Sequence, residues 1–247
     1  MRFLKAIVVA GCVAGSAIDV AAQTDDSRVY INLNGAFEPG SQTYSDSGTF
    51  RKYEEDGTLN VSSEVSSGAV FDVSAGLKIT GNFTFGLGFH RTSSSDDATV
   101  TGTAPDPLFF NRPRAFSQTV NDLTRTEQAL HISLGYLVPL GERFDLHLTA
   151  GPSSFRFDQQ VPAGVTIAES GATFTSTVVV ENREDSAWGG HVGADFSYAV
   201  VEGDAATLRL GAFVRYAAAA SDFLVVSNTA STKLGGVQFG AGLRVRF

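Results

Sequence analysis

Cysteine is almost absent from this chain of 247 residues, which contains only Cys12. One thiol forms no intramolecular disulfide, so the fold must be held by burial and backbone pairing rather than by cross-links. Residues 9–12 (Val-Ala-Gly-Cys) fit a lipobox, and a lipid anchor on Cys12 is therefore an alternative to its removal with a signal peptide.

Lysine is also scarce, and acidic residues outnumber basic ones by 26 to 18, which gives a net charge of −8. A nucleic-acid-binding protein presents a basic face to the phosphates. The charge balance therefore argues against nucleic acid as a partner.

Long apolar runs are missing after the first residues of the chain. No later segment has the 18 or more uncharged apolar residues expected of a transmembrane helix. This absence does not exclude a membrane-spanning β-barrel, because only alternate residues of its strands face lipid.

The N-terminus has the features of a secretory signal peptide. Arg2 and Lys5 supply the positive start, residues 6–18 are apolar or small, and small residues at 20–22 suit cleavage. The apolar stretch is too short for a membrane anchor, which needs about 20 residues. We expect residues 1–22 to be the signal peptide.

Apolar residues recur at every second position along eight segments of the remaining chain. A strand places alternate residues on opposite faces, so each segment has one apolar face without charge. The expected strands are residues 28–37, 68–79, 82–91, 128–138, 143–157, 187–201, 207–217 and 234–247.

The connections between these strands alternate between short and long. An even number of strands with tight turns on one side and long loops on the other is the layout of a transmembrane barrel. In one long connection, residues 161–168 and 173–181 have strand propensity, and we expect a hairpin above the barrel rather than a ninth strand. The short turns are residues 80–81, 139–142 and 202–206, and the long connections are 38–67, 92–127, 158–186 and 218–233.

The last segment, residues 237–247, alternates without interruption and ends on Phe247. It resembles the closing strand of bacterial outer-membrane β-barrels, and the chain resembles small eight-stranded proteins of the OmpA/OmpX type without a periplasmic peptidoglycan-binding domain. The resemblance implies a terminal assembly signal, read by periplasmic chaperones and the barrel-assembly machinery. The signal residues would be Phe239, Leu243, Val245 and Phe247.

The resulting expectation is an all-β, eight-stranded, antiparallel up-and-down barrel of residues 23–247 in the bacterial outer membrane, with long extracellular loops and short periplasmic turns. A secreted soluble sandwich or lipocalin-like barrel is the alternative. The many glycines on the polar parity argue against it, because a water-facing sheet normally carries Lys, Glu and Thr.

The polar parity would face the barrel interior, which in an eight-stranded barrel is just wide enough to be filled by side chains. Buried charges must be paired, so we expect a plug of salt bridges and glycines that leave room for arginine. Arg244 and Arg246 share this parity and need acidic partners. The alternative is a narrow channel or transporter with rearranging pairs. The expected network consists of Asp72, Lys78, Asp145, Asp195, Arg209 and Arg215.

All four histidines also fall on the inward parity. Imidazole binds Zn, Cu and Ni, but no tight ligand spacing is present. We therefore expect a polar network, with no metal and no cofactor.

An enzymatic function has one local motif in its favour. His131-Ile-Ser133 resembles the His-x-Ser element of outer-membrane lipid A deacylases, although Leu134 stands where that family has Asn. Both residues would face the lumen rather than lipid, and no acid completes a triad. We expect no enzymatic activity and no catalytic residue, with lipid A modification as a third alternative.

Basic residues at the loop-side strand ends could bind lipopolysaccharide phosphates, since arginine offers bidentate contacts. These are Arg91, Arg156 and Lys233. Aromatic residues are expected to form two girdles in contact with outer-membrane lipids. The loop-side girdle would be Phe37, Phe155, Trp188 and Tyr216, and the turn-side girdle Phe83, Tyr136, Phe144, Tyr198 and Phe247.

The sequence predicts a structural or surface-interaction role in the outer membrane. The loops are acidic and rich in hydroxyl groups, as in residues 54–56 and 93–97. They could recognise an extracellular ligand that the sequence does not identify.

Overall fold

The computed structural model describes residues 28–40, 42–66, 68–170, 173–203, 205–224 and 229–247. The predicted signal peptide, residues 1–22, lies outside these ranges. No helix in the described ranges is long and apolar enough to span a membrane. The strands are β1 (Val29–Glu38), β2 (Gln42–Lys52), β3 (Glu55–Val65), β4 (Gly68–Thr80), β5 (Phe83–Ala104), β6 (Arg114–Pro139), β7 (Phe144–Ser170), β8 (Thr173–Glu202), β9 (Thr207–Leu224), β10 (Thr229–Leu234) and β11 (Val237–Arg246).

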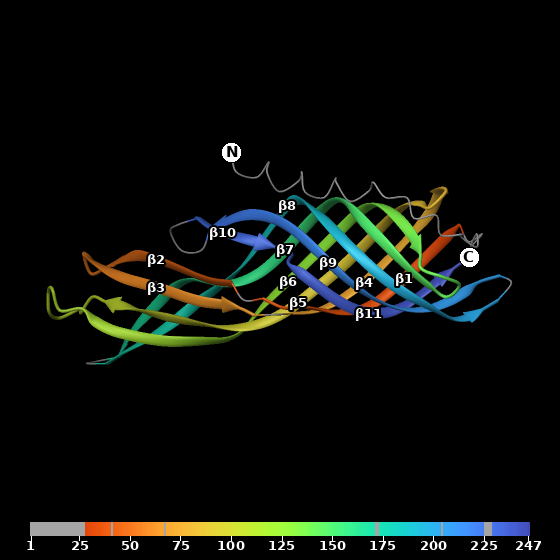
Figure 1. Cartoon of the computed structure of the whole chain (residues 1–247). Coiled ribbons are helices and arrows are strands. Elements are labelled where there is room, and N and C mark those ends of the chain that lie inside the picture. Colours follow the sequence, from red (N-terminus) through yellow and green to blue (C-terminus); the bar gives the residue numbers. More distant parts are fainter. Residues whose placement is uncertain (1–27, 41, 67, 171–172, 204, 225–228) are drawn as a thin grey trace.

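Eight of these strands close into a ring of antiparallel pairs, β1-β4-β5-β6-β7-β8-β9-β11. The first and last ring strands pair directly, with Ile31 opposite Val245 and Phe37 opposite Phe239. The ring has no open edge, so every ring strand has a neighbour on both sides (Figure 1). The predicted eight-stranded antiparallel barrel is therefore confirmed.

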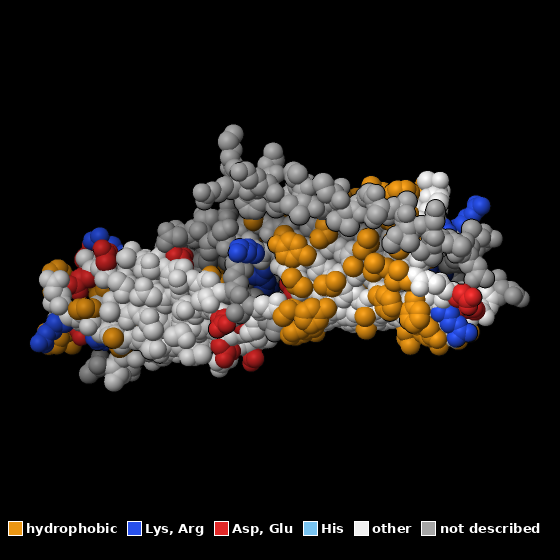
Figure 2. Space-filling view, viewed as in Figure 1, with side chains coloured by type: hydrophobic (Ala, Val, Ile, Leu, Met, Phe, Trp, Pro, Cys, Tyr) orange, Lys and Arg blue, Asp and Glu red, His pale blue; other side chains and the backbone are white. Residues whose placement is uncertain are grey.

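Residues that alternate in the sequence lie alternately on the outside and the inside of the barrel. On β1, Ile31 and Leu33 are exposed, whereas their neighbours Asn32 and Asn34 are buried. The same pattern holds on the other ring strands, and Figure 2 shows apolar side chains gathered over the barrel half of the molecule. The apolar belt is what a lipid-facing wall requires, since charge there is costly.

Tight turns join the ring strands at one end, as predicted. Gly81, at a φ of 54°, occupies the turn between β4 and β5, where the left-handed conformation favours glycine. The backbone of Phe247 meets Val29 at this same end, where its N–H donates to the Val29 carbonyl at 3.0 Å.

The long connections are mostly strand rather than irregular loop. β7 and β8 stay paired out to Ser170 and Thr173, which confirms the predicted hairpin of residues 161–168 and 173–181. Beyond the ring, β5 and β6 remain paired out to Ala104 and Arg114. The β2–β3 hairpin adds to the free edge of β5, and β10 adds to β9. The strands β2, β3 and β10 are not predicted by the alternation in the sequence.

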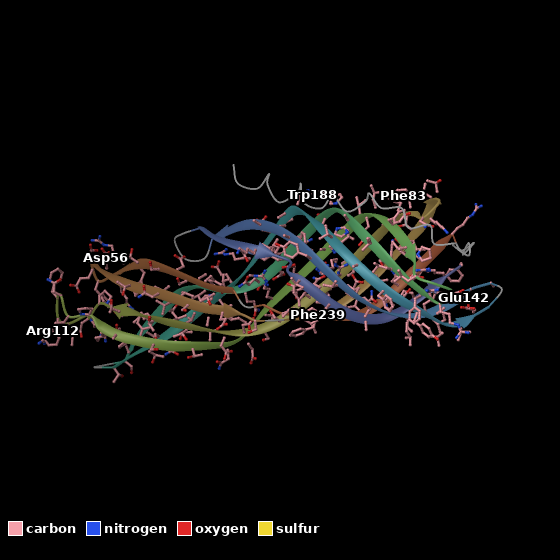
Figure 3. The ribbon with its side chains drawn as sticks, in the orientation of Figure 1. Asp56, Phe83, Arg112, Glu142, Trp188 and Phe239 are labelled. Atoms are coloured by element: carbon pink, nitrogen blue, oxygen red, sulfur yellow. The ribbon has the colours of Figure 1, made fainter. Side chains whose placement is uncertain are left out.

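The extended strands curl around an apolar core of their own, outside the barrel. Its buried members come from four hairpin strands and include Val61 and Val100, which pair directly across β3 and β5. This core explains why the polar stretch at residues 93–97 continues as strand. Figure 3 shows the extension reaching from the barrel to Arg112 and Asp56 at the end opposite to Glu142. The core consists of Leu59, Val61, Val100, Ala104, Phe116 and Ile167.

Candidate functional site: the barrel lumen and its outer mouth

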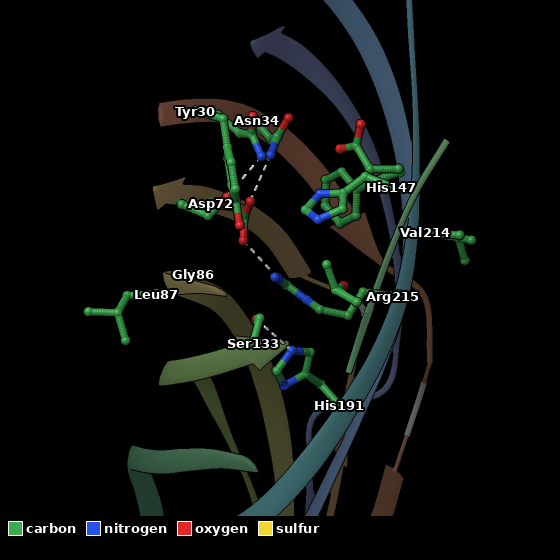
Figure 4. Close-up of a pocket in the computed structure, with 17 residues that line it drawn as sticks. Tyr30, Asn34, Asp72, Gly86, Leu87, Ser133, His147, His191, Val214 and Arg215 are labelled. Atoms are coloured by element: carbon green, nitrogen blue, oxygen red, sulfur yellow. Dashed lines mark hydrogen bonds and ion pairs between the residues drawn. The ribbon is translucent and has the colours of Figure 1, made fainter. Parts of the chain in front are cut away.

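A charged pair crosses the middle of the lumen. Asp72 on β4 and Arg215 on β9 approach to 2.8 Å, and the side-chain amide of Asn34 donates to Asp72 at 2.7 Å (Figure 4). Both side chains are largely shielded from solvent, and an unpaired charge there would lower the stability of the fold. The structure thus brings together two members of the predicted network from opposite walls.

A second cluster fills the turn-side end of the lumen. The Asp145 carboxylate pairs with Arg209 and accepts two hydrogen bonds from Arg246, at 2.7 and 2.8 Å. The Ser197 hydroxyl donates to Asp145 at 2.7 Å and accepts from Arg209 at 3.0 Å. One carboxylate therefore faces two guanidinium groups, with a hydroxyl filling the remaining space.

Asp195 has a different partner from those in the predicted network. It pairs with Arg244 through both carboxylate oxygens, and Arg244 is among the largest fully buried side chains of the described residues. Lys78 is half-buried and lines a small cavity at this end together with Asp195 and Arg246.

Glycines give these long side chains their space. A Cβ atom on Gly211 would lie 2.5 Å from Nε of Arg244, and one on Gly86 would lie 2.3 Å from the Tyr30 hydroxyl. The glycine-rich inward parity is thus the complement of the arginines and tyrosine that fill the lumen.

Three of the four histidines meet in a hydrogen-bonded column. Nδ1 of His90 lies 2.8 Å from Nε2 of His131, and Nδ1 of His131 lies 2.7 Å from the Ser153 hydroxyl. The Ser153 hydroxyl is 2.9 Å from Nδ1 of His191, whose Nε2 is 2.9 Å from Ser133. Nε2 of His90 lies 3.3 Å from the side-chain nitrogen of Gln238, so both ring nitrogens of all three imidazoles have partners. His147 lies apart, with its Nε2 2.8 Å from the Thr84 hydroxyl.

In this column the two residues of the His-x-Ser motif have partners other than each other. The Ser133 hydroxyl bonds to His191, whereas His131 bonds to Ser153 and His90. His131 is buried inside the ring, as expected from its parity.

Above the histidines, an apolar layer closes the loop side of the lumen. Phe155 is fully buried and packs edge-on against both His90 and His131. The prediction of Phe155 in the lipid-facing girdle is wrong, because Phe155 shares the inward parity of His147 on the same strand. Its buried neighbours are Ala129, Phe157, Val161, Ala217 and Leu234.

At the outer mouth, two carboxylates face a depression of about 270 Å³. Glu127 lies on β6 beyond the apolar belt and is buried, and Glu38 ends β1. Burial raises the pKa of Glu127 to about 7, with the Glu38 charge acting in the same direction and Arg125 opposing it. The sequence does not predict this site, because residues 38 and 127 fall in separate expected loops.

The predicted lipopolysaccharide residues are all exposed at the loop-side ends. Arg91 and Arg156 flank Gln128 on neighbouring strands and line one depression of about 250 Å³. Arg156 also pairs with Glu184 at 2.6 Å. Lys233 lies on β10 opposite Ala220, away from this pair in the strand order.

The predicted assembly residues lie on the outside of β11. Phe239 and Leu243 are exposed, and Val245 is half-exposed. Phe247 follows the strand and is also exposed.

Residues 8–247 of the sequence match the family described as outer membrane protein beta-barrel domain. The chain belongs to this family. It is therefore a bacterial outer-membrane protein, in agreement with the closed ring and its apolar belt. No curated protein matches the sequence significantly.

Solved outer-membrane proteins resemble the chain at low identity. The Neisserial surface protein NspA is 15% identical, with a TM-score of 0.44 over 89% of this chain and 97% of that one. OprG from Pseudomonas aeruginosa is 12% identical, with a TM-score of 0.43 over 90% and 96%. Ail, the attachment invasion locus protein of Yersinia pestis, is 12% identical, with a TM-score of 0.40 over 88% and 98%.

Proposed function

We propose that this outer-membrane barrel has a structural and surface-interaction role, with a lumen plugged by its own polar side chains. The observation that carries the proposal is how completely the lumen is filled. Two cavities among the lumen residues have volumes of only about 60 and 20 Å³. A water molecule needs about 10–15 Å³ of such space, so these cavities hold only a few waters.

The plug has an ionic part and an apolar part. Asp72, Asp145 and Asp195 each face at least one arginine across the lumen. Phe155 and the apolar cluster around it lie above them. An ion crossing the barrel would have to separate several buried pairs and displace this cluster, which opposes steady conduction.

Planar-bilayer recordings on the refolded protein test this proposal. We expect no stable large open states for the wild type, and the same for Arg156→Gln, which alters an exposed pair. Combining Phe155→Ala with Asp72→Ala and Arg215→Ala removes part of both layers and should produce open states. Stable large openings in the wild type would instead establish a channel.

A narrow channel is the second candidate function. It is favoured by the continuous run of hydrogen bonds from His90 through His131 and Ser153 to His191. Such a polar path would conduct small solutes if the pairs around Arg215 rearranged. Swelling of proteoliposomes in small sugars distinguishes this transport from a closed lumen.

We further propose that the protein has no enzymatic activity. The one sequence motif for lipid cleavage has its serine bonded to His191 and its histidine bonded elsewhere, inside the ring. Lipid A is expected to be identical in cells with and without the protein. A change in its acyl chains would overturn this proposal.

The extracellular sheet is proposed as the surface for partner recognition. Leu108, Phe109 and Phe110 are exposed at the tip of the β5–β6 hairpin, far from the apolar belt. Exposed apolar residues that do not face lipid often mark interaction sites.

Two other surfaces have proposed partners. Arg91, Arg156 and Lys233 are proposed to bind lipopolysaccharide phosphates. The outer face of β11 is proposed to be recognised during barrel assembly.

A further inference from the structure

Three potential metal ligands converge at the loop-side end of the lumen. Glu38 ends β1, His90 lies within β5 and Glu127 lies on β6. One ligand atom from each of the three lies within 4.8 Å of the others. The three residues are far apart in sequence: Glu38 on β1 and Glu127 on β6 lie on either side of the paired strands β4 and β5, and His90 is on β5 between them.

The hydrogen bonds of Gln238 show that two of these ligand atoms point to the same place. Its side-chain amide nitrogen lies 2.6 Å from Oε2 of Glu38 and 3.3 Å from Nε2 of His90. One NH₂ group thus faces Oε2 of Glu38 and Nε2 of His90, and Nε2 presents a lone pair to this place in the tautomer with the proton on Nδ1.

Two of the three candidate ligands, His90 and Glu127, are also oriented by further hydrogen bonds, as metal ligands usually are. Nδ1 of His90 is occupied by His131, which leaves Nε2 directed at the mouth. Glu127 accepts from the backbone N–H of Gly235 at 2.7 Å and from Arg125 at 3.3 Å. His90 and Glu127 are therefore held in place before any ion binds.

The mouth carries side chains of both signs, because Arg125 pairs with Glu127 at 3.3 Å and Lys233 lines the same depression as the two carboxylates. Two carboxylates lie close together, and burial of Glu127 makes their mutual repulsion costly. Thr92 lines the same depression, and its buried hydroxyl has no hydrogen-bond partner among the described residues. An orphaned buried hydroxyl beside paired carboxylates is what a bound ion or its water would satisfy.

We propose that Glu38, His90 and Glu127 bind one divalent transition-metal ion at the outer mouth of the barrel. One imidazole and two carboxylates suit Zn²⁺ and Co²⁺, with bonds of about 2.0–2.2 Å. Binding displaces the two contacts of the Gln238 amide and draws the three ligands together. The adjoining depression of about 270 Å³ leaves the remaining coordination position open to water or a small anionic ligand.

Titration of the refolded, metal-free protein with Co²⁺ tests the proposal, because the visible absorption of Co²⁺ reports its coordination. The wild type should bind one Co²⁺ with an absorption band that Zn²⁺ abolishes by competition. Glu38→Gln, His90→Gln and Glu127→Gln should each weaken binding at least about tenfold. His147→Gln is the matched control, since it removes a lumen imidazole outside the site, and its affinity should stay unchanged.

Two further measurements keep the result unambiguous. Heat-modifiable gel migration shows whether each variant has refolded, and Glu38→Gln is decisive because Glu38 is only half-buried. The electron paramagnetic resonance spectrum of bound Cu²⁺ should show coupling to one imidazole nitrogen. Coupling to two or three nitrogens would place the ion in the histidine column and would overturn the proposal. Unchanged Co²⁺ affinity in folded Glu38→Gln would also overturn it. This site is independent of whether the lumen conducts.

Discussion

The carboxylate of Asp72 and the guanidinium of Arg215 meet at 2.8 Å across the lumen, although 143 positions separate them in the sequence. Arg215 also donates two hydrogen bonds to the side-chain oxygen of Gln238, at 2.9 and 2.7 Å. Through Gln238 the central ion pair is connected to Glu38 at the outer mouth. The plug and the proposed metal site therefore share one hydrogen-bond network.

Removing one partner of the central pair should destabilise the barrel strongly. Arg215→Gln leaves the Asp72 charge buried without its counter-ion, and we expect the free energy of unfolding to fall by about 3–5 kcal/mol. Arg156→Gln, which alters an exposed pair, should cost about 0–1 kcal/mol. Urea unfolding from lipid vesicles measures both.

The double variant Asp72→Asn with Arg215→Gln gives a sharper test of the same pair. Because it leaves no lone charge, its loss of stability should be clearly smaller than the sum of the two single losses. Additive losses would show that the two side chains do not stabilise each other.

A methyl group added at Gly211 should be poorly tolerated. The Cβ atom of Gly211→Ala would lie 2.5 Å from Nε of Arg244 and 2.8 Å from the backbone oxygen of Phe196. We expect a loss of about 1–3 kcal/mol, as for other overpacked interiors. Gly35→Ala is the control, because nothing lies within 4 Å of its Cβ position. Equal effects of the two substitutions on unfolding would contradict the packing described for the lumen.

The extracellular sheet should loosen in acid through Glu169. Arg114 donates to both carboxylate oxygens of Glu169, at 2.6 and 3.0 Å, and these hydrogen bonds lower the pKa of Glu169 below its ordinary value. The pair therefore contributes its stability above about pH 4.5, and this contribution is lost as pH falls through the lowered pKa.

Hydrogen exchange measures this local stability as protection factors corrected for the intrinsic rate. Residues 104–116 and 165–178 should lose protection between pH 7 and pH 3. Glu169→Gln should show low protection at pH 7 and a weaker pH dependence, whereas Glu184→Gln, at an exposed pair, should behave as wild type. A pH response that persists unchanged in Glu169→Gln would assign it to other groups.

Reversing the loop-side charges should weaken contact with lipopolysaccharide. Arg91→Glu, Arg156→Glu and Lys233→Glu together replace three cations near lipid phosphates with anions, which favours dissociation. Cells with this variant are expected to be more sensitive to detergent than cells with the wild type. Arg112→Glu, at the far tip, serves as the control, and equal sensitivity of all three strains would refute the contact.

Local alternation was sufficient to predict the wall of the barrel. Ile31, Leu87 and Leu210 were assigned to the lipid side from their parity alone, and all three are exposed. Parity also placed the four histidines and the lumen arginines inside. Phe155 follows the same rule, because it shares the inward parity of His147 and is buried inside the barrel rather than in the aromatic girdle.

Alternation could not reveal which inward residues meet. Asp195 lies opposite His147 on β7 and Phe213 on β9. Its ionic partner, however, is Arg244 on β11, the strand beyond β9. That choice depends on strand tilt and stagger, which follow from closing the ring. The edge strands β2, β3 and β10 were missed for a related reason, because their pairing depends on neighbours distant in the chain.

The sequence by itself determined the period-two wall, the sidedness of the turns and the identity of the groups inside, because each is a local consequence of strand geometry. Only the tertiary structure decided that Asp145 faces two arginines, that His90 joins His131, and that Glu38 and Glu127 share one mouth. Those contacts are set by the register of all eight strands at once, and a closed ring fixes that register only when its first and last strands pair.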